Sequence, residues 1–297
     1  MRKIFLFPVM FALLLSSSLF AQDKDTAKKD SPWDYGAISS FTLAQTLLKN
    51  WSAGGENSFA YAAFTKAHLN YKKGKHAWSN NLDLAYGSIK QGDKPFRKTD
   101  DKIELNSQYG LKAFDNFYYT ALLNFKTQFT TGYDYSDNDS VKISNFMAPG
   151  YLVYSLGMSY KPNKYFNIYA SILSGKTTYV LDPDLSAVGA FGVDSGKTVR
   201  RELGAYVKIQ YNKEILKNLT LNTKIDLFSN YKHNPQNIDV NADLLVAYKI
   251  NKFLTFNIKT QMIYDDDMKI LVDPETGKTG PRLQIQEIIG LGITYKF

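Results

Sequence analysis

Charged side chains recur at every second position in several segments of this chain, as in Lys102 and Glu104 or Lys224 and Asp226. Alternate side chains of a strand share one face, so these charges would form one wall. If the strands close into a barrel, that wall is the lumen, where mixed charges can line a water-filled pore of weak ion selectivity. The same groups could instead pair across the lumen and plug it. The candidate lumen-lining residues are Lys66, Asp83, Lys102, Glu104, Lys126, Glu202, Lys208, Lys224, Asp226, Asp243, Lys259 and Arg282.

Histidine and serine could give a different chemistry, that of a hydrolase with a Ser–His pair at the rim of a barrel. The chain has His68, His76 and His233, and only His233 falls in a predicted outer loop, near Ser229. No Gly-x-Ser-x-Gly elbow is present. We interpret His233 as a solvated loop residue and predict that the protein is not an enzyme and has no cofactor.

Acidic residues cluster in two long connections, at residues 265–267 and at Asp134, Asp137 and Asp139. Carboxylate oxygens at this spacing could hold Ca²⁺. No complete calcium-loop pattern is present, so we interpret these residues as solvated loop charge. The chain contains no cysteine, which leaves neither disulfides nor thiolate metal sites.

The elements that would position these side chains are strands. Apolar and polar residues alternate with a period of two in twelve segments. Most segments exceed the usual strand length of about 5–6 residues and reach the roughly 9–11 residues that a tilted membrane strand needs. The segments are residues 36–48, 58–72, 76–89, 100–113, 117–130, 150–161, 165–175, 199–212, 218–231, 238–250, 253–265 and 282–297.

Short and long polar connections alternate between these segments, for example KKGK at residues 72–75 against KQGDKPFRKT at 90–99. This alternation and the even number of strands predict an all-β fold: a transmembrane antiparallel up-and-down β-barrel of about 12 strands, with short periplasmic turns and longer extracellular loops. An exported soluble barrel or sandwich is the alternative, because one face of its strands also alternates.

The N-terminal residues indicate export. Arg2 and Lys3 precede an apolar run and a stretch of small residues, the pattern of a cleaved signal peptide at residues 1–21. A short periplasmic tether at 22–34 and the barrel at 35–297 would follow. Without Arg2 and Lys3, 36 − 2 = 34 basic residues face 28 acidic ones, a net charge of +6. Since both signs are interspersed in an exported chain, we expect no nucleic-acid partner.

The chain ends on GLGITYKF, an apolar strand with a terminal aromatic residue. Such an end is tolerable in lipid, and alternate residues from Leu283 to Phe297 would face it. The ending resembles the C-terminal signal of outer-membrane proteins, carried here by Gly292, Tyr295 and Phe297. This resemblance implies the barrel assembly machinery as a partner during biogenesis. Outer-membrane lipids, including lipopolysaccharide, would be the lasting partners.

The chain from about Trp33 onward also resembles an uncharacterised family of Bacteroidetes outer-membrane proteins. The stretches that carry the likeness are residues 50–58, 80–87, 98–107, 122–129, 189–193, 234–240, 264–267 and 280–282. The resemblance implies the outer membrane of a Gram-negative cell and assigns no activity. We expect passive passage of small polar solutes or ions through the lumen. A closed barrel acting as a structural or binding platform through its loops is the alternative, and a hydrolase at the rim is the third possibility.

Overall fold

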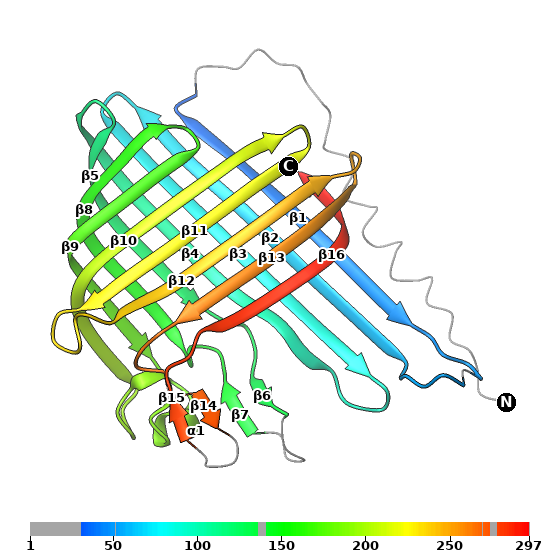
Figure 1. Cartoon of the computed structure of the whole chain (residues 1–297). Helices are drawn as coiled ribbons and strands as arrows, with labels where there is room; N and C mark the ends of the chain where they lie inside the picture. Colours follow the sequence, from blue (N-terminus) through cyan, green and yellow to red (C-terminus); the bar gives the residue numbers. More distant parts are fainter. Residues whose placement is uncertain (1–30, 51, 136–140, 269, 274–277, 297) are drawn as a thin grey trace. The chain divides into compact units, whose positions relative to one another are not determined.

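The computed structural model describes residues 31–50, 52–135, 141–268, 270–273 and 278–296. Twelve strands form one closed barrel, in which each strand pairs antiparallel with its neighbours (Figure 1). The fold prediction is therefore confirmed. The predicted signal peptide lies outside the described residues, and so does most of the predicted tether. No helix in the described part of the chain is long and apolar enough to cross a membrane.

The barrel strands are, in chain order, β1 (Trp33–Thr46), β2 (Ser58–Lys73), β3 (His76–Gln91), β4 (Arg97–Phe114), β5 (Phe117–Thr127), β8 (Gly150–Asn163), β9 (Phe166–Tyr179), β10 (Val199–Leu216), β11 (Leu219–Asn230), β12 (Ile238–Lys249), β13 (Leu254–Tyr264) and β16 (Gln284–Lys296). The long connections carry two small hairpins, β6 (Gly132–Asp134) with β7 (Val141–Ser144) and β14 (Ile270–Asp273) with β15 (Lys278–Gly280). They also carry a short helix, α1 (Pro183–Ala187), and a 3₁₀ turn, η2 (Ala190–Gly192).

The strand boundaries differ from the predicted ones mainly by extension. β1 begins at Trp33, so Trp33 and Asp34 belong to the strand and not to the tether. β9 continues to Tyr179, four residues beyond the predicted end, and β10 continues to Leu216. The barrel has a short-turn end, where β2 meets β3 and β4 meets β5, and a long-loop end, which carries α1 and the small hairpins (Figure 1).

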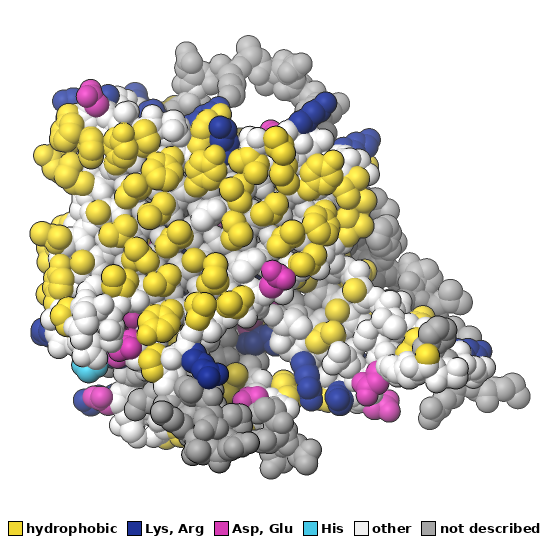
Figure 2. Space-filling model, in the orientation of Figure 1, with side chains coloured by type: hydrophobic (Ala, Val, Ile, Leu, Met, Phe, Trp, Pro, Cys, Tyr) yellow, Lys and Arg dark blue, Asp and Glu magenta, His cyan; other side chains and the backbone are white. Residues whose placement is uncertain are grey.

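The strands sort their side chains onto two faces, as β4 illustrates. Lys102, Glu104 and Asn106 are buried toward the lumen, while Leu105 and Tyr109 are exposed on the outer surface. Figure 2 shows hydrophobic side chains spread over the outer surface of the strands, with Lys and Arg gathered toward the two ends. An apolar belt between polar ends is the surface that a membrane barrel presents to lipid.

Aromatic side chains occupy part of the lumen, which the alternation alone did not predict. Leu122, Tyr169, Tyr206 and Phe228 form a buried cluster on the inner side of β5, β9, β10 and β11. The Tyr206 hydroxyl donates to Asp226 at 2.5 Å and the Tyr169 hydroxyl lies 2.7 Å from Ser155 Oγ. Buried tyrosines of this kind are stable because each polar tip has a partner.

Two glycines permit close approach of neighbouring strands beside irregularities in the ladders. A Cβ atom at Gly204 would lie 2.0 Å from the carbonyl oxygen of Ser229, and one at Gly157 would lie 2.2 Å from that of Ala170. The register shifts next to both positions. A side chain at either glycine would require the backbone to move, because no real Cβ tolerates such a contact.

Candidate functional site

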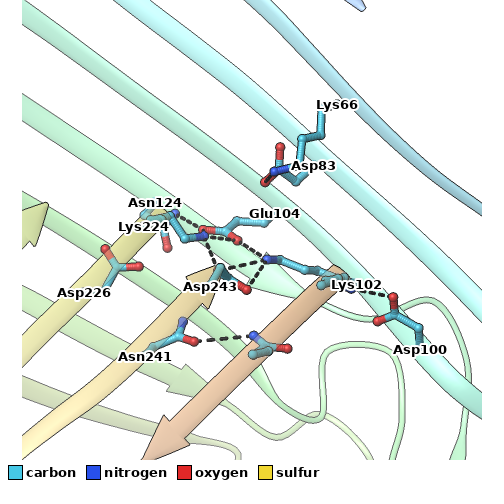
Figure 3. Close-up of polar contacts among 12 residues, drawn as sticks. Lys66, Asp83, Asp100, Lys102, Glu104, Asn124, Lys224, Asp226, Asn241 and Asp243 are labelled. Carbon is cyan, nitrogen blue, oxygen red and sulfur yellow. Dashed lines mark hydrogen bonds and ion pairs between the residues drawn. The ribbon is translucent and has the colours of Figure 1, made fainter. Parts of the chain in front are cut away.

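Four charged residues meet near the middle of the lumen, and we call them the lumen bridge: Lys102, Glu104, Lys224 and Asp243. Glu104 lies 2.9 Å from Lys102 Nζ and 2.6 Å from Lys224 Nζ. Asp243 lies 3.3 Å from Lys102 Nζ and 2.9 Å from Lys224 Nζ. Each carboxylate thus contacts both ammonium groups (Figure 3), an arrangement in which every charge is compensated.

The lumen bridge joins opposite walls of the barrel. Lys102 and Glu104 come from β4, whereas Lys224 comes from β11 and Asp243 from β12. Along the closed sheet β12 lies six strands from β4 in either direction, and β11 lies five strands away by the shorter path. Because a twelve-stranded barrel has no greater separation, these contacts cross the full width of the lumen.

Neighbouring side chains extend the bridge along the wall. Asn124 Nδ2 donates to Glu104 at 3.0 Å. Lys259 on β13 contacts Asp100 on β4 at 2.5 Å, a second contact between distant walls. Lys208, which is fully buried, contacts Asp226 at 2.8 Å. Together with the buried cluster of Leu122, Tyr169, Tyr206 and Phe228, these contacts place charged and aromatic side chains across the lumen at this level.

A second group of charges lies closer to the long-loop end, and we call it the rim cluster: Lys176, Arg200, Glu202, Asp239, Asp265 and Asp267. Lys176 Nζ lies 2.6 Å from Asp239 and 3.4 Å from Asp265. Arg200 contacts Glu202 at 2.9 Å and also pairs with Asp267. Since four carboxylates face two cations, this part of the lumen carries excess negative charge.

Lys126 differs from the other lumen lysines. Its strand register opposes Glu104 on one side and Tyr151 on the other, so it faces the lumen beside the bridge. Within the described residues Lys126 has no ion-pair partner within 4.0 Å. Lys126 thus differs from Lys102, Lys208 and Lys224, each of which contacts a carboxylate.

The lumen toward the short-turn end is built mainly from amides and hydroxyls. Asn106 and Gln108 follow Glu104 on β4, and both are buried. Asn167 donates to Gln108 at 3.2 Å and to Gln210 at 3.0 Å, so the amides of β4, β9 and β10 form a chain. The two halves of the lumen thus differ in chemistry, charged on the loop side and mostly uncharged on the turn side.

The structure places the predicted lumen residues at several different sites. Lys102, Glu104, Lys224 and Asp243 meet in the bridge. Lys126 is the register partner of Glu104, Lys208 contacts Asp226, and Lys259 contacts Asp100. Lys66 and Asp83 lie 3.8 Å apart on β2 and β3 and are partly exposed, and Asp83 is opposite Glu104 in the register, so this pair borders the bridge. Glu202 belongs to the rim cluster. Arg282 is exposed and precedes β16, so the structure does not bring it to the strand wall.

Sequence reasoning missed Asp100, Lys176, Arg200 and Asp239 as members of the lumen. Asp100, Arg200 and Asp239 share the phase of predicted lumen residues on their own strands, so the alternation itself could have found them. Lys176 was not predicted because the predicted strand ended at residue 175, whereas β9 continues to Tyr179. Asp265 and Asp267 belong to a loop that folds back onto Lys176 and Arg200. The alternation of residues within strands cannot predict such a loop contact.

The residues considered for a hydrolase and for a calcium site lie as follows. His233 Nε2 lies 3.7 Å from Asp267, and Ser229 Oγ donates to the carbonyl of Pro235 at 2.7 Å, so Ser229 is not paired with a histidine. In the acidic loop, Asp266 accepts from Asn237 at 2.6 Å. Among the described residues no group of three or more acidic or histidine side chains is arranged so that it could hold a metal ion; Asp137 and Asp139 lie outside them.

The C-terminal strand carries the predicted insertion residues on both faces. Gly292 packs against Ser40 and Thr42 of β1 on the lumen side, and Tyr295 is exposed on the outer surface. Phe297 lies outside the described residues. β16 pairs with β13 and β1, which closes the barrel.

Comparison with known proteins finds a family match for part of the chain. Residues 43–133 match a family described as "Protein of unknown function (DUF3078)". The prediction of an uncharacterised family is confirmed there, and four of the stretches that carried the resemblance fall within the matched residues. No curated protein matches the sequence.

Solved structures resemble this chain over most of its length at low sequence identity. An outer membrane channel from Pseudomonas putida F1 is 9% identical, with 93% of this chain and 99% of that chain covered and a TM-score of 0.40. The translocator domain of the autotransporter NalP from Neisseria meningitidis is 10% identical, with 91% and 90% covered and a TM-score of 0.35. The Salmonella typhi OmpF complex with daunomycin is 10% identical, with 89% and 97% covered and a TM-score of 0.31.

Proposed function

We propose that this protein is an outer-membrane channel for small polar solutes or ions, whose resting lumen is closed by the lumen bridge. The polar inner wall and the apolar outer surface support a barrel that spans lipid around an aqueous path. The bridge supports a closed resting state, because its ion pairs join opposite walls at 2.6–3.3 Å. Opening would require these four side chains to exchange partners or to turn toward their own walls.

The main observation behind the proposal is that side chains, and not a backbone segment, cross the lumen at the bridge. Lysine and glutamate have several rotatable bonds, so the closure can open without unfolding a strand. A barrel that is always closed does not need charged residues in its lumen. Replacing a buried ion pair by hydrophobic residues of similar volume often leaves the stability of the protein unchanged. Retained charges at the constriction therefore favour a closure that responds to ions or voltage.

The test is the conductance of the refolded chain in a planar lipid bilayer. The critical variant neutralises the bridge without changing net charge: Lys102→Gln, Glu104→Gln, Lys224→Gln and Asp243→Asn. The control is Asp194→Asn with Lys197→Gln, an exposed loop pair 2.8 Å apart. We expect brief, infrequent openings in the wild type and the control, and long stepwise openings in the bridge variant.

Two outcomes would contradict this proposal in different ways. A correctly folded but silent bridge variant would mean that the aromatic cluster and the amide chain fill the lumen by themselves. Equal, steady conductance in all three proteins would mean that the lumen conducts and the bridge does not close it.

A closed barrel that presents its loops to a binding partner is the second candidate. It is favoured by the ordered loop at α1, where Lys142 contacts Asp182 at 2.8 Å and Asp184 at 2.5 Å, and Asn145 donates to Asp182 at 2.8 Å. Such anchoring gives a loop a fixed outer surface. Under this candidate the bridge variant would remain silent, so the same recording separates the two functions.

A further inference from the structure

The seam that closes the barrel is much shorter than its other strand pairings. β1 and β16 pair over four residues, from Ile38 with Lys296 to Phe41 with Ile293. Each of the other eleven ladders of the barrel contains at least ten residue pairs. The part of the seam toward the long-loop end therefore lacks a ladder among the described residues.

The unpaired edges follow directly after the last pair. On β1 they comprise Thr42–Thr46, which remain paired with β2 on their other side. On β16 they comprise the residues from Gln284 to Gly292, which remain paired with β13. The Thr42 side chain still lies against Gly290, 3.3 Å from where a Cβ would stand. Beyond this contact the two strands separate, and Figure 1 shows β1 and β16 diverging toward the long-loop end.

The exposure of side chains supports an opening at this place. Leu43 and Leu291 face outward and are 57% and 49% exposed. Ala44 and Thr46 have the lumen phase of β1, yet both are exposed, unlike Ser40 of the same phase, which is buried. β16 is not paired with β1 at these two positions, which fits their exposure.

A carboxylate lies on the outer side of this same edge. Glu287 is opposite Thr260 in the register and has the outward phase of Ile285 and Ile289, which are 63% and 58% exposed. Glu287 is itself exposed. A carboxylate within an apolar belt is unfavourable unless a polar group contacts it. The unpaired carbonyl and amide groups of both edges have the same requirement, because lipid tails cannot hydrogen-bond them.

We propose that the β1–β16 seam is a lateral binding site for an amphiphile that carries an ammonium head group. The head group would lie in the seam, donate to the free carbonyl groups of the strand edges and pair with Glu287. Its tail would lie on Leu43, Ile289 and Leu291. This proposal rests on the membrane location stated above and is independent of whether the lumen conducts.

The open seam can be tested by disulfide formation, since the chain contains no cysteine. Phe41→Cys with Ile293→Cys joins a paired position. Leu43→Cys with Leu291→Cys joins the positions that would form the second pair beyond Phe41 and Ile293 if the ladder continued. Disulfides need Cα atoms about 4.4–6.8 Å apart. We expect the first pair to oxidise fully in the folded barrel and the second to remain largely reduced. Equal oxidation of both pairs would overturn the proposal.

Occupancy can be tested with a fluorophore on a single cysteine and a nitroxide-labelled alkylammonium amphiphile that quenches it. The probe site is Ala44→Cys at the seam, and the control is Ala247→Cys, which has the lumen phase on the fully paired β12. A third site, Leu123→Cys on the outer surface of β5, reports how much amphiphile enters the membrane. An alkyl sulfate of equal chain length and label is the matched probe of opposite charge.

We expect the alkylammonium to quench the Ala44 probe roughly threefold more than the alkyl sulfate does, after both are normalised to Leu123. Glu287→Gln should remove that difference while leaving the Leu123 signal unchanged. The proposal is overturned if Ala44 is quenched no more than Ala247, or equally by both head groups. A silent conductance recording would leave these results unaffected, so failure of the channel proposal remains distinguishable.

Discussion

Glu104 on β4 and Lys224 on β11 are 120 residues apart in sequence and lie 2.6 Å apart across the lumen. Their strands occupy opposite walls, so this ion pair connects the two halves of the barrel. Asp243 and Lys102 complete a closed set of alternating charges. Removing one member leaves buried charge of one sign, and the first prediction concerns that imbalance.

Glu104→Gln should destabilise the folded barrel by about 3 kcal/mol, because Lys102 and Lys224 then face each other with only Asp243 between them. The measurement is the free energy of unfolding from a urea titration in lipid vesicles. Asp83→Asn is the matched control, since Asp83 and Lys66 form a wider, partly exposed pair that should contribute at most about 1 kcal/mol. Equal losses in both variants would show that the bridge is no stronger than a surface pair.

Lys126→Glu should shift the ion preference of the open lumen toward cations. Lys126 faces the lumen beside the bridge, and its replacement changes the local charge by two units. The measurement is the reversal potential in a salt gradient, recorded in the bridge-neutral variant so that openings are long. Lys142→Glu serves as the control, because Lys142 lies in the β7 hairpin outside the barrel. A shift of equal size in the control would assign selectivity to the loops.

Gly204→Ala should prevent stable folding, whereas Gly110→Ala should be tolerated. The added Cβ at Gly204 would meet the Ser229 carbonyl oxygen at 2.0 Å, while at Gly110 the nearest atom is a Tyr118 side-chain carbon at 3.4 Å. Overpacking of this kind typically costs about 1–3 kcal/mol or more. The readout is the compact, heat-modifiable band of unboiled protein on a denaturing gel. Normal folding of Gly204→Ala would mean that β10 and β11 can separate there without loss.

The loop at α1 should loosen in acid. Hydrogen bonds from Lys142 and Asn145 lower the pKa of Asp182 to about 2, and Asp182 also caps α1 by accepting from the backbone of Leu185. The ordinary aspartate pKa is about 3.9. Because folding lowers this pKa, the anchor is fully present above about pH 4 and is lost as the pH falls through about 2.

The measurement for the α1 loop is the mobility of a spin label at Val188→Cys, an exposed position after the helix. We expect an immobile label at neutral pH and increasing mobility between about pH 4 and 2. Asp182→Asn should give a mobile label at every pH. A label that stays immobile in the Asn variant would show that other contacts hold the loop.

The sequence predicted the barrel well because strand alternation and loop length are local properties. All twelve predicted segments correspond to barrel strands, and lumen residues such as Lys102 and Glu104 follow from phase alone. The alternation within each strand does not predict which charged side chains of different strands contact each other. Glu104 contacts Lys224 only because the sheet closes, and Asp267 reaches Arg200 only because its loop folds back. Glu287 has the lipid-facing phase of its strand, and its exposure agrees with that phase although its side chain is charged.

The two halves of the lumen also have an electrical consequence. Fixed charge lies in the rim cluster and the lumen bridge, while Asn106, Gln108 and Asn167 line the path toward the short-turn end. Counter-ions would accumulate at one mouth and not at the other. Current through the open barrel would then depend on the sign of the applied voltage, that is, the barrel would rectify. The direction of rectification would report the orientation of the protein in the membrane.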